Sequence, residues 1–388
     1  MFSRRTDWKL TPNRFTEAVE EVRASGKEIL DLTVSNPTRA GIEFDGAAIL
    51  DSLRNPKSLD YDPQPKGLLS ARQAVAAYYG ERGQQVSPEH LVLTTSTSEG
   101  YSYAFRLLAN PGDEVLVPKP SYPLFDFLAE LQDVKLVGYP LLYDHGWQID
   151  WPSLESAVTE KTRAVVVVHP NNPTGSFVST AERERLSELC RERGLALIVD
   201  EVFLDYALDG SRRQSFVTND RALTFTLSGI SKISALPQMK LAWIAISGPA
   251  SDVDASMQRL EIIADTYLSP SAPVQLAAGT LLDQRKKIQP QLVHRVLANL
   301  TELDRQLTEQ KSSARLDVEG GWYAVLRVPA TQSDEELAIA LLRNTGTMVH
   351  PGHFYDFPRD GYLVLSLIAP EEDFREGISR ALKFLNSF

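Results

Sequence analysis

Residues 223–243 read LTFTLSGISKISALPQMKLAW, and this segment decides the fold of the chain. The apolar run at residues 223–227 is typical of a buried strand. Small residues follow it, and Lys232 stands among them where the backbone must turn tightly. A lysine at such a turn is ordinary surface unless it is paired or used chemically, because its charge is costly to bury. Other segments of the chain decide between these two possibilities.

Strands and helices alternate on both sides of this segment. Apolar strands are expected at residues 91–93, 114–117, 134–139, 164–168, 196–199 and 241–246, with amphipathic helices between several of them. Such strands predict a mostly parallel sheet covered by helices on both faces, and therefore a large α/β domain at residues 45–280. Residues 1–44 and 281–388 combine helices, one of them expected at 290–311, with a few strands, and predict a smaller α+β domain.

The composition limits the kind of protein. The 388 residues are 43% hydrophobic and 23% charged, as in soluble globular proteins, and the net charge of −11 argues against a nucleic-acid partner bound through a broad basic face. Cys190 is the only cysteine, which excludes an intrachain disulfide or a cysteine metal cluster, and no metal site is expected. A start without a signal peptide, and the absence of an apolar run of about eighteen residues, predict a cytoplasmic protein that does not cross a membrane.

Polar residues follow several of the expected strands. Thr97 and Ser98 lie between a strand and a helix, where free N–H groups favour an anion, although such residues also cap helices. The NNPTG segment at residues 171–175 is a turn, but open α/β sheets bind ligands at such carboxyl ends of strands. Asp200 follows three aliphatic residues and needs a partner, for which a cationic ring nitrogen, a helix N-terminus or an arginine is a candidate.

The order of the motifs is more specific than any one of them. The series consists of Tyr61, Gly67, Arg72, TSEG at 97–100, PGDE at 111–114, PSYP at 120–123, NNPTG at 171–175, DEV at 200–202 and SK at 231–232. It resembles the class I and II aminotransferases, the aspartate-aminotransferase-like branch of the fold-type I pyridoxal-phosphate enzymes. The resemblance extends from about residue 30 to the C-terminus, and it implies the fold-type I architecture of a large and a small domain.

The resemblance implies roles around a bound pyridoxal 5'-phosphate. Lys232 would form the Schiff base, the internal aldimine, and would transfer the proton. Asp200 would pair with the pyridinium nitrogen so that the ring can accept electrons. Asn172 would hydrogen-bond the ring 3-oxygen, and Tyr122 would stack on the ring face.

The same resemblance implies a phosphate site and a second subunit. Thr97, Ser98, Ser231 and Lys240 would hold the phosphate. Tyr61 would reach into the active site of a partner chain, which implies a homodimer with shared active sites.

The chain departs from the family where the substrate binds. Alignment of the segment after residue 364 places Val364 at the position of the arginine that usually pairs with the substrate carboxylate. Valine cannot replace the planar guanidinium group, which binds a carboxylate through two hydrogen bonds. Either another cation substitutes, or the substrate is not a simple α-amino acid. Arg39, which follows the SNPT segment that begins at Ser35, is the candidate cation, and a solvated loop arginine is the alternative. We expect Ser35, Arg39 and Asn172 to contact the substrate.

Four further positions differ around the cofactor. Phe203 stands where the family has a tyrosine, Gly229 where a serine is usual, Ser96 where a glycine is usual, and Lys240 where an arginine is usual. Lysine keeps the charge of arginine but cannot form the paired hydrogen bonds of its guanidinium group. We expect cofactor binding to survive these changes.

The sequence therefore predicts a pyridoxal-phosphate-dependent aminotransferase that acts by ping-pong half-reactions between an amino donor and a keto acid. Two alternatives remain open. The first is a lyase, decarboxylase or racemase with the same cofactor, since the bond that stands perpendicular to the ring decides the outcome. The second is a non-enzymatic binding protein that keeps the fold. The identity of the substrate is not predicted.

Overall fold

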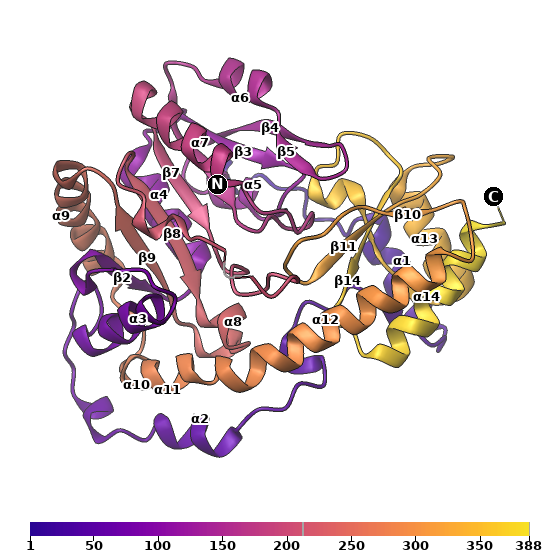
Figure 1. Ribbon diagram of the computed structural model, residues 1–388, viewed down its shortest axis with the longest axis horizontal. Coiled ribbons are helices and arrows are strands. Elements are labelled where there is room, and N and C mark those ends of the chain that lie inside the picture. Colours follow the sequence, from indigo (N-terminus) through magenta and orange to yellow (C-terminus); the bar gives the residue numbers. More distant parts are fainter. Residues whose placement is uncertain (212, 388) are drawn as a thin grey trace.

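The computed structural model describes residues 1–211 and 213–387 (Figure 1). Its largest element is an eight-stranded sheet in the order β2-β9-β8-β7-β6-β3-β4-β5. The strands are β2 (Leu91–Thr94), β3 (Glu114–Lys119), β4 (Lys135–Tyr143), β5 (Trp147–Ile149), β6 (Thr162–Val168), β7 (Ala196–Asp200), β8 (Thr224–Gly229) and β9 (Ala242–Ser247). The pairs that join β4, β3, β6, β7 and β8 are parallel, and the remaining pairs are antiparallel. The expected mostly parallel, mixed sheet is confirmed.

The centre of the sheet is buried on both faces. Strands β7 and β8 have only buried residues, and residues 196–199 of β7 are apolar without alternation, as in a strand covered on both faces. The edge strand β5 was not expected from the sequence. It pairs with the end of β4 through a turn at residues 144–146, where His145 and Gly146 both adopt positive φ angles.

Helices pack on both faces of this sheet (Figure 1). The helices of the large domain are α3 (Leu69–Glu81), α4 (Thr97–Leu108), α5 (Phe125–Glu130), α6 (Trp151–Ala157), α7 (Thr180–Arg193), α9 (Ala250–Tyr267), α10 (Ala272–Leu276) and α11 (Ala278–Asp283), with the short α2 (Gly46–Ser52) preceding them. Helices α4 and α9 share one apolar cluster with the sheet, α6 and α7 share a second, and α3, α10 and α11 share a third. The spacing of Ser179 and Glu182 predicts a capping box, and the two residues form one at the start of α7.

A smaller sheet lies at the other end of the molecule, in the order β10-β11-β14-β13. It consists of β10 (Ala314–Arg315), β11 (Tyr323–Arg327), β13 (His350–Pro351) and β14 (Tyr362–Ser366), and it packs with α1 (Arg14–Ala24), α13 (Asp334–Thr345) and α14 (Glu371–Leu385). The N-terminal residues join this part through β1 (Leu30–Asp31), which pairs with β12 (Thr347–Met348). The two sheets agree with a large and a small domain, and the boundaries near residues 45 and 280 remain a proposal.

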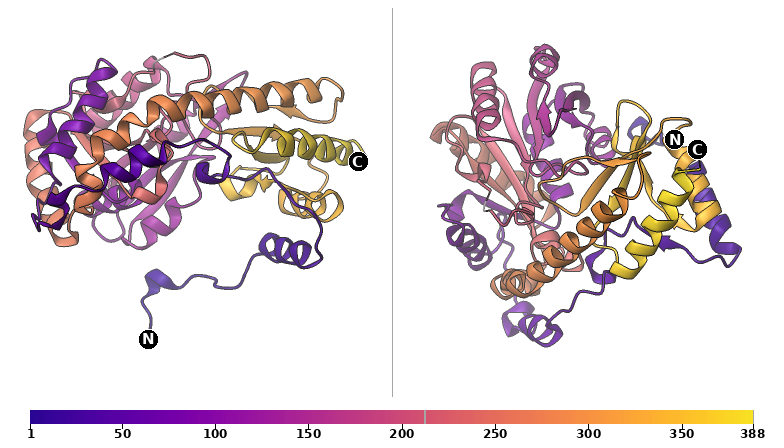
Figure 2. Two further views of the ribbon diagram at one scale, coloured as in Figure 1. Left: turned by 90° about the horizontal axis from the view of Figure 1, so that it is seen from below. Right: turned by 45° about the vertical axis from the view of Figure 1, so that its right-hand side comes forward.

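Helix α12 (Arg285–Leu307) connects the two parts (Figures 1 and 2). It begins five residues before the expected start at Pro290, so the proline lies inside the helix rather than at its first turn. The apolar residues at 29–34 predict a further short strand, but β1 is shorter, because only Leu30 and Asp31 find a pairing partner in β12.

Candidate active site

The carboxyl ends of the parallel strands β6, β7 and β8 meet at one cavity of about 220 Å³. Asn172 follows β6, Asp200 ends β7, and Lys232 lies just after β8. The cavity is lined by Ser35, Thr97, Ser98, Tyr101, Tyr122, Phe125, Leu128, Val168, Asn172, Asp200, Val202, Phe203, Ser231, Lys232 and Tyr323. The strand-end rule of open α/β sheets therefore places these side chains together, as the sequence suggested.

Lys232 is carried by a single helical turn, α8 (Ile230–Ile233), directly after β8. The turn lies close to β9, because a Cβ atom at Gly229 would stand 2.8 Å from the Cβ of Ala242. The Lys232 Nζ lies 5.1 Å from the ring centroid of Trp322 and 5.6 Å from that of Phe203. Burial among these rings lowers the pKa of Lys232 to about 8, against the opposing effect of Asp200. At pH 7 about a tenth of the amine is thus neutral and nucleophilic, against less than one in a thousand for a lysine with the ordinary pKa of 10.5.

Asp200, the last residue of β7, and Glu201, which follows it, have different surroundings. Asp200 faces the cavity and accepts hydrogen bonds from Val202 N (3.1 Å) and the Tyr101 hydroxyl (3.2 Å). Burial raises the pKa of Asp200 to about 6, while those hydrogen bonds and Lys232 act to lower it. Glu201 lies outside the cavity lining, where Ser215 Oγ and Phe216 N donate to its carboxylate. Only Asp200 is therefore placed to meet a cation in the cavity.

The first turn of α4 forms one wall of the cavity. Ser96 caps this twelve-residue helix by accepting a hydrogen bond from Glu99 N (3.2 Å), and Thr97 and Ser98 present its first backbone N–H groups. In a helix of this length the N-terminal N–H groups and the dipole favour an anion. The cavity thus contains both an anion-binding corner and the carboxylate of Asp200.

The loop after β6 presents Asn172 to the cavity. Its neighbour Asn171 fixes the loop, donating to Pro120 O (3.1 Å) and to Thr174 Oγ1 (2.9 Å). The carboxamide oxygen of Asn172 is buried, and among the described residues it has no hydrogen-bond partner. Because a buried polar atom without a partner is costly, this atom indicates that the cavity receives a polar ligand. Tyr122, two residues after Pro120, lines the same cavity.

Several residues expected in the site lie outside this cavity. The Tyr61 side chain is 82% exposed and lines a separate surface pocket of about 320 Å³ with Leu268. Arg39 and Lys240 are exposed, and neither lines the cavity. Val364 is 1% exposed in β14, where it pairs with Val325 and His350 in the apolar core of the small domain. Within the described part of the chain, Lys232 is the only lysine or arginine that lines the cavity.

Sequence reasoning missed part of the site. Tyr323 and Trp322 come from the small domain, and Tyr101 from α4 supports Asp200. The sequence distinguishes Phe203 only by the hydroxyl that it lacks. Its ring centroid lies 5.1 Å from that of Trp322, and the ring forms part of the cavity wall beside Lys232. An aromatic pair at the start of a strand, as at residues 322–323, is more often core, so no local signal distinguishes these rings.

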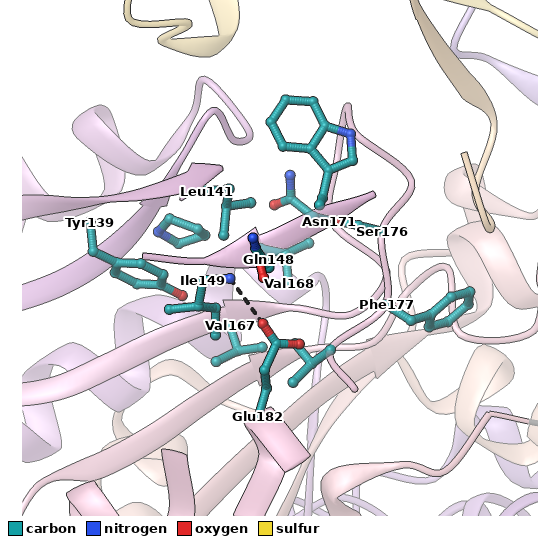
Figure 3. Close-up of a pocket in the computed structure, with 13 residues that line it drawn as sticks. Tyr139, Leu141, Gln148, Ile149, Val167, Val168, Asn171, Ser176, Phe177 and Glu182 are labelled. Carbon is teal, nitrogen blue, oxygen red and sulfur yellow. Dashed lines mark hydrogen bonds between the residues drawn. The ribbon is translucent and has the colours of Figure 1, made fainter. Parts of the chain in front are cut away.

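Another, partly open cavity is lined by residues of the β4–β5 hairpin (Figure 3). It is bordered by Tyr139, Ile149 and Phe177, and Glu182 accepts a hydrogen bond from Ile149 N across one side. Its volume of about 20 Å³ is enough for a water molecule but not for a substrate. The cavity at Lys232 is therefore the better candidate for a reaction.

Two physical exclusions hold for the part of the chain that is described. No helix there is long and apolar enough to span a bilayer. No group of three or more His, Cys, Asp or Glu side chains there is arranged to bind a metal ion.

Comparison with known proteins places the chain in a family. The family model described as aminotransferase class I and II matches residues 27–378. The glutamate-pyruvate aminotransferase AlaA of Haemophilus influenzae is 27% identical over 371 residues, which cover 94% of this chain and 92% of the relative. The alanine aminotransferase of Mycobacterium tuberculosis is 28% identical over 377 residues, or 95% and 88% of the two chains. The solved alanine aminotransferase from Pyrococcus furiosus superposes with a TM-score of 0.89, covers 100% of both chains and is 22% identical.

The depressed pKa of Lys232 gives a test that needs no substrate. In cofactor-free protein, reductive methylation of Lys232 should rise with pH through a midpoint at about 8, because only the neutral amine attacks formaldehyde. Peptide mass spectrometry after brief labelling at a series of pH values measures that midpoint. A midpoint at the ordinary lysine value of 10.5 would contradict the electrostatics described for the cavity.

Proposed function

This chain belongs to the class I and II aminotransferases and transfers an amino group with the help of pyridoxal 5'-phosphate, and we propose that Lys232 is the residue that holds the cofactor and moves the proton. The observation that carries the proposal is the enclosure of a lysine amine with a depressed pKa and a single carboxylate in one cavity at the ends of β7 and β8.

The residues of the cavity fit this cofactor. The anion corner at Thr97 and Ser98 suits its phosphate, and Asp200 suits the cationic nitrogen of its ring. The amide of Asn172, whose oxygen is buried without a partner among the described residues, suits the ring hydroxyl. When bound, the cofactor supplies an aldehyde that accepts the amino group and a ring that accepts electrons.

The chain's own groups divide the remaining work. Asp200 would keep the ring nitrogen protonated. Burial raises the pKa of its carboxyl, and the positive charge of the ring nitrogen would lower that pKa again, because opposite charge favours the ionised form. Lys232 would act as general base and acid in the 1,3-transfer of a proton between the two carbons bonded to the transferred nitrogen, for which a pKa of about 8 is well suited. Tyr122 covers the ring, and Phe125 and Leu128 help to exclude water.

Of the four residues proposed to bind the phosphate, three line the cavity and one does not. Thr97, Ser98 and Ser231 line the cavity. Lys240 lies on the surface after a short 3-10 turn, with a left-handed φ of 54°, and does not line the cavity, so its contact with the phosphate stays a prediction. A serine is not possible at Gly229 without moving Ala242, which explains why the chain lacks the usual hydroxyl there.

The substrates are proposed to be a small amino donor and a keto acid. The relatives are named for alanine, glutamate and pyruvate, which supports substrates of this class. Ser35, Asn172 and Tyr323 line the cavity and supply neutral donors in place of the arginine that Val364 replaces. Arg39 is exposed, and its contact with the substrate stays a prediction. We also propose that the enzyme works in the cytoplasm.

A homodimer with shared active sites is proposed on the basis of one apolar surface. Leu59 is 92% exposed and Tyr61 82%, and Leu268 borders the same pocket as Tyr61. Exposed apolar side chains grouped in this manner mark an interface, and a cyclic dimer would bring Tyr61 of each chain toward the other.

Replacing the lysine tests the function directly. Lys232→Ala should lose the visible absorbance of bound cofactor and all measurable amino transfer while remaining folded, because an alanine cannot attach the aldehyde. Visible absorbance, circular dichroism and a coupled assay with alanine and a keto acid measure the three properties. An undiminished visible band in the variant would overturn the assignment of Lys232.

Complementation between two inactive variants tests the shared site. If Tyr61 acts in the partner's active site, co-refolded Lys232→Ala and Tyr61→Ala chains should form hybrid dimers with one intact site. Random mixing should then recover about a quarter of the wild-type activity, because half of the dimers are hybrids and half of their sites are intact. If the mixture recovers no activity and the Tyr61→Ala homodimer is itself impaired, Tyr61 acts in the active site of its own chain.

A further inference from the structure

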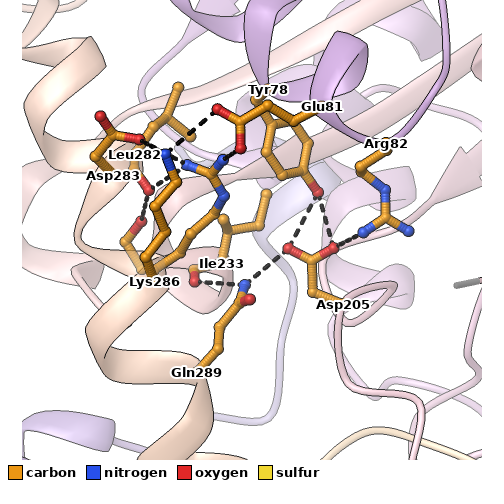
Figure 4. A network of polar contacts seen from close by, with 11 residues as sticks. Tyr78, Glu81, Arg82, Asp205, Ile233, Leu282, Asp283, Lys286 and Gln289 are labelled. Carbon is orange, nitrogen blue, oxygen red and sulfur yellow. Dashed lines mark hydrogen bonds and ion pairs between the residues drawn. The ribbon is translucent and has the colours of Figure 1, made fainter. Parts of the chain in front are cut away.

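The one-turn helix that carries Lys232 has its last carbonyl groups bonded by side chains. Helix α8 (Ile230–Ile233) is too short to satisfy these acceptors by itself, since the last four carbonyls of any helix lack a regular partner. The Tyr206 hydroxyl donates to the carbonyl of Lys232 at 2.6 Å. The next carbonyl, that of Ile233, accepts a hydrogen bond from Gln289 Nε2 at 2.9 Å (Figure 4).

The orientation of Gln289 is determined by a second acceptor. Its Nε2 also donates to Asp205 Oδ2 at 2.7 Å, so the end of the amide that faces these partners must be the NH₂ group. Asp205 is itself held by the Tyr78 hydroxyl (3.1 Å) and by an ion pair with Arg82. Its carboxylate therefore fixes the amide that grips the Ile233 carbonyl (Figure 4).

Gln289 also connects the site to the rest of the molecule. It lies on α12 (Arg285–Leu307), the helix that runs from the large domain to the small sheet (Figure 2). The next residue, Pro290, has no backbone N–H and removes the helix hydrogen bond that would reach the carbonyl of Lys286. At this weakened turn, the Gln289 side chain binds α12 to the backbone immediately after Lys232.

We propose that Gln289 is a positioning residue for the amino-transfer reaction, which holds the Lys232 turn in register with α12 through the carbonyl of Ile233. This proposal rests on the function proposed above for Lys232. The amine at the end of a flexible four-carbon chain must meet the reacting carbon accurately, and a displacement of about 1 Å in such a group costs on the order of 100-fold in rate. Binding of the substrate does not depend on the Ile233 carbonyl, so the effect belongs to the chemical step.

Two substitutions at Gln289 and a matched control test the proposal. Gln289→Leu removes both hydrogen bonds without adding a charge. Gln289→Glu keeps the size of the side chain, but its carboxylate cannot donate a hydrogen bond to Asp205 or to the Ile233 carbonyl. Gln291→Leu is the control, because Gln291 lies on the same helix and bonds Glu43 and Lys287 away from the site. The holoenzymes are compared by their melting temperature, by kcat and KM, and by the rate at which an amino donor bleaches the visible cofactor band in a single half-reaction.

Both Gln289 variants should show a fall of about 10-fold to 100-fold in kcat and in the bleaching rate, with KM for the donor unchanged and the Gln291 variant like wild type. A lowered melting temperature with an unaltered bleaching rate in Gln289→Leu would mean that Gln289 only stabilises the fold, and would overturn the proposal. An equal rise in KM without loss of kcat would also overturn it. A wild-type enzyme whose band no donor bleaches would refute the proposed function itself, and the role of Gln289 with it.

Discussion

The structure depends on the enclosure of one amine and one carboxylate in the same cavity. Removing either charge from water is costly, and each group shifts toward its neutral form as a result: the pKa of Lys232 falls to about 8 and that of Asp200 rises to about 6. Their mutual attraction offsets part of that cost. Such a pair is maintained only where the surrounding structure is rigid, and it is most useful where a ligand completes its charges.

The scaffold supplies this rigidity from both domains. The parallel strands β7 and β8 bring Asp200 and the α8 turn to one edge of the sheet, and the tight contact of Gly229 with Ala242 sets how close that turn lies to β9. The small domain contributes Trp322, whose ring lies over the amine of Lys232. A movement between the domains would therefore change the surroundings of the reacting amine, and Gln289 joins the long helix α12 to the residue after Lys232.

The sequence predicted the part of the site that follows from strand ends. Asp200 ends β7, Lys232 and Asn172 lie within four residues of the ends of β8 and β6, and in a parallel sheet such positions meet at one edge. The β4–β5 hairpin, the interior position of Pro290 and the short β1 were missed, because tertiary pairing rather than local preference decides them. Trp322 and Gln289 reach the site from about 90 and 57 residues beyond Lys232, and neither carries a local signal of that role. For Tyr61, Arg39 and Lys240 the resemblance gave roles that their exposed positions do not test.

The most direct test of the central claim is to locate the covalent attachment of the cofactor. The protein is incubated with pyridoxal 5'-phosphate, reduced with borohydride, digested and mapped by mass spectrometry. We predict a single stoichiometric phosphopyridoxyl group on Lys232, because this amine is nucleophilic and lies beside both the anion corner at Thr97 and the carboxylate of Asp200. Modification spread over exposed lysines, or concentrated on another lysine while Lys232 stays free, would contradict the account.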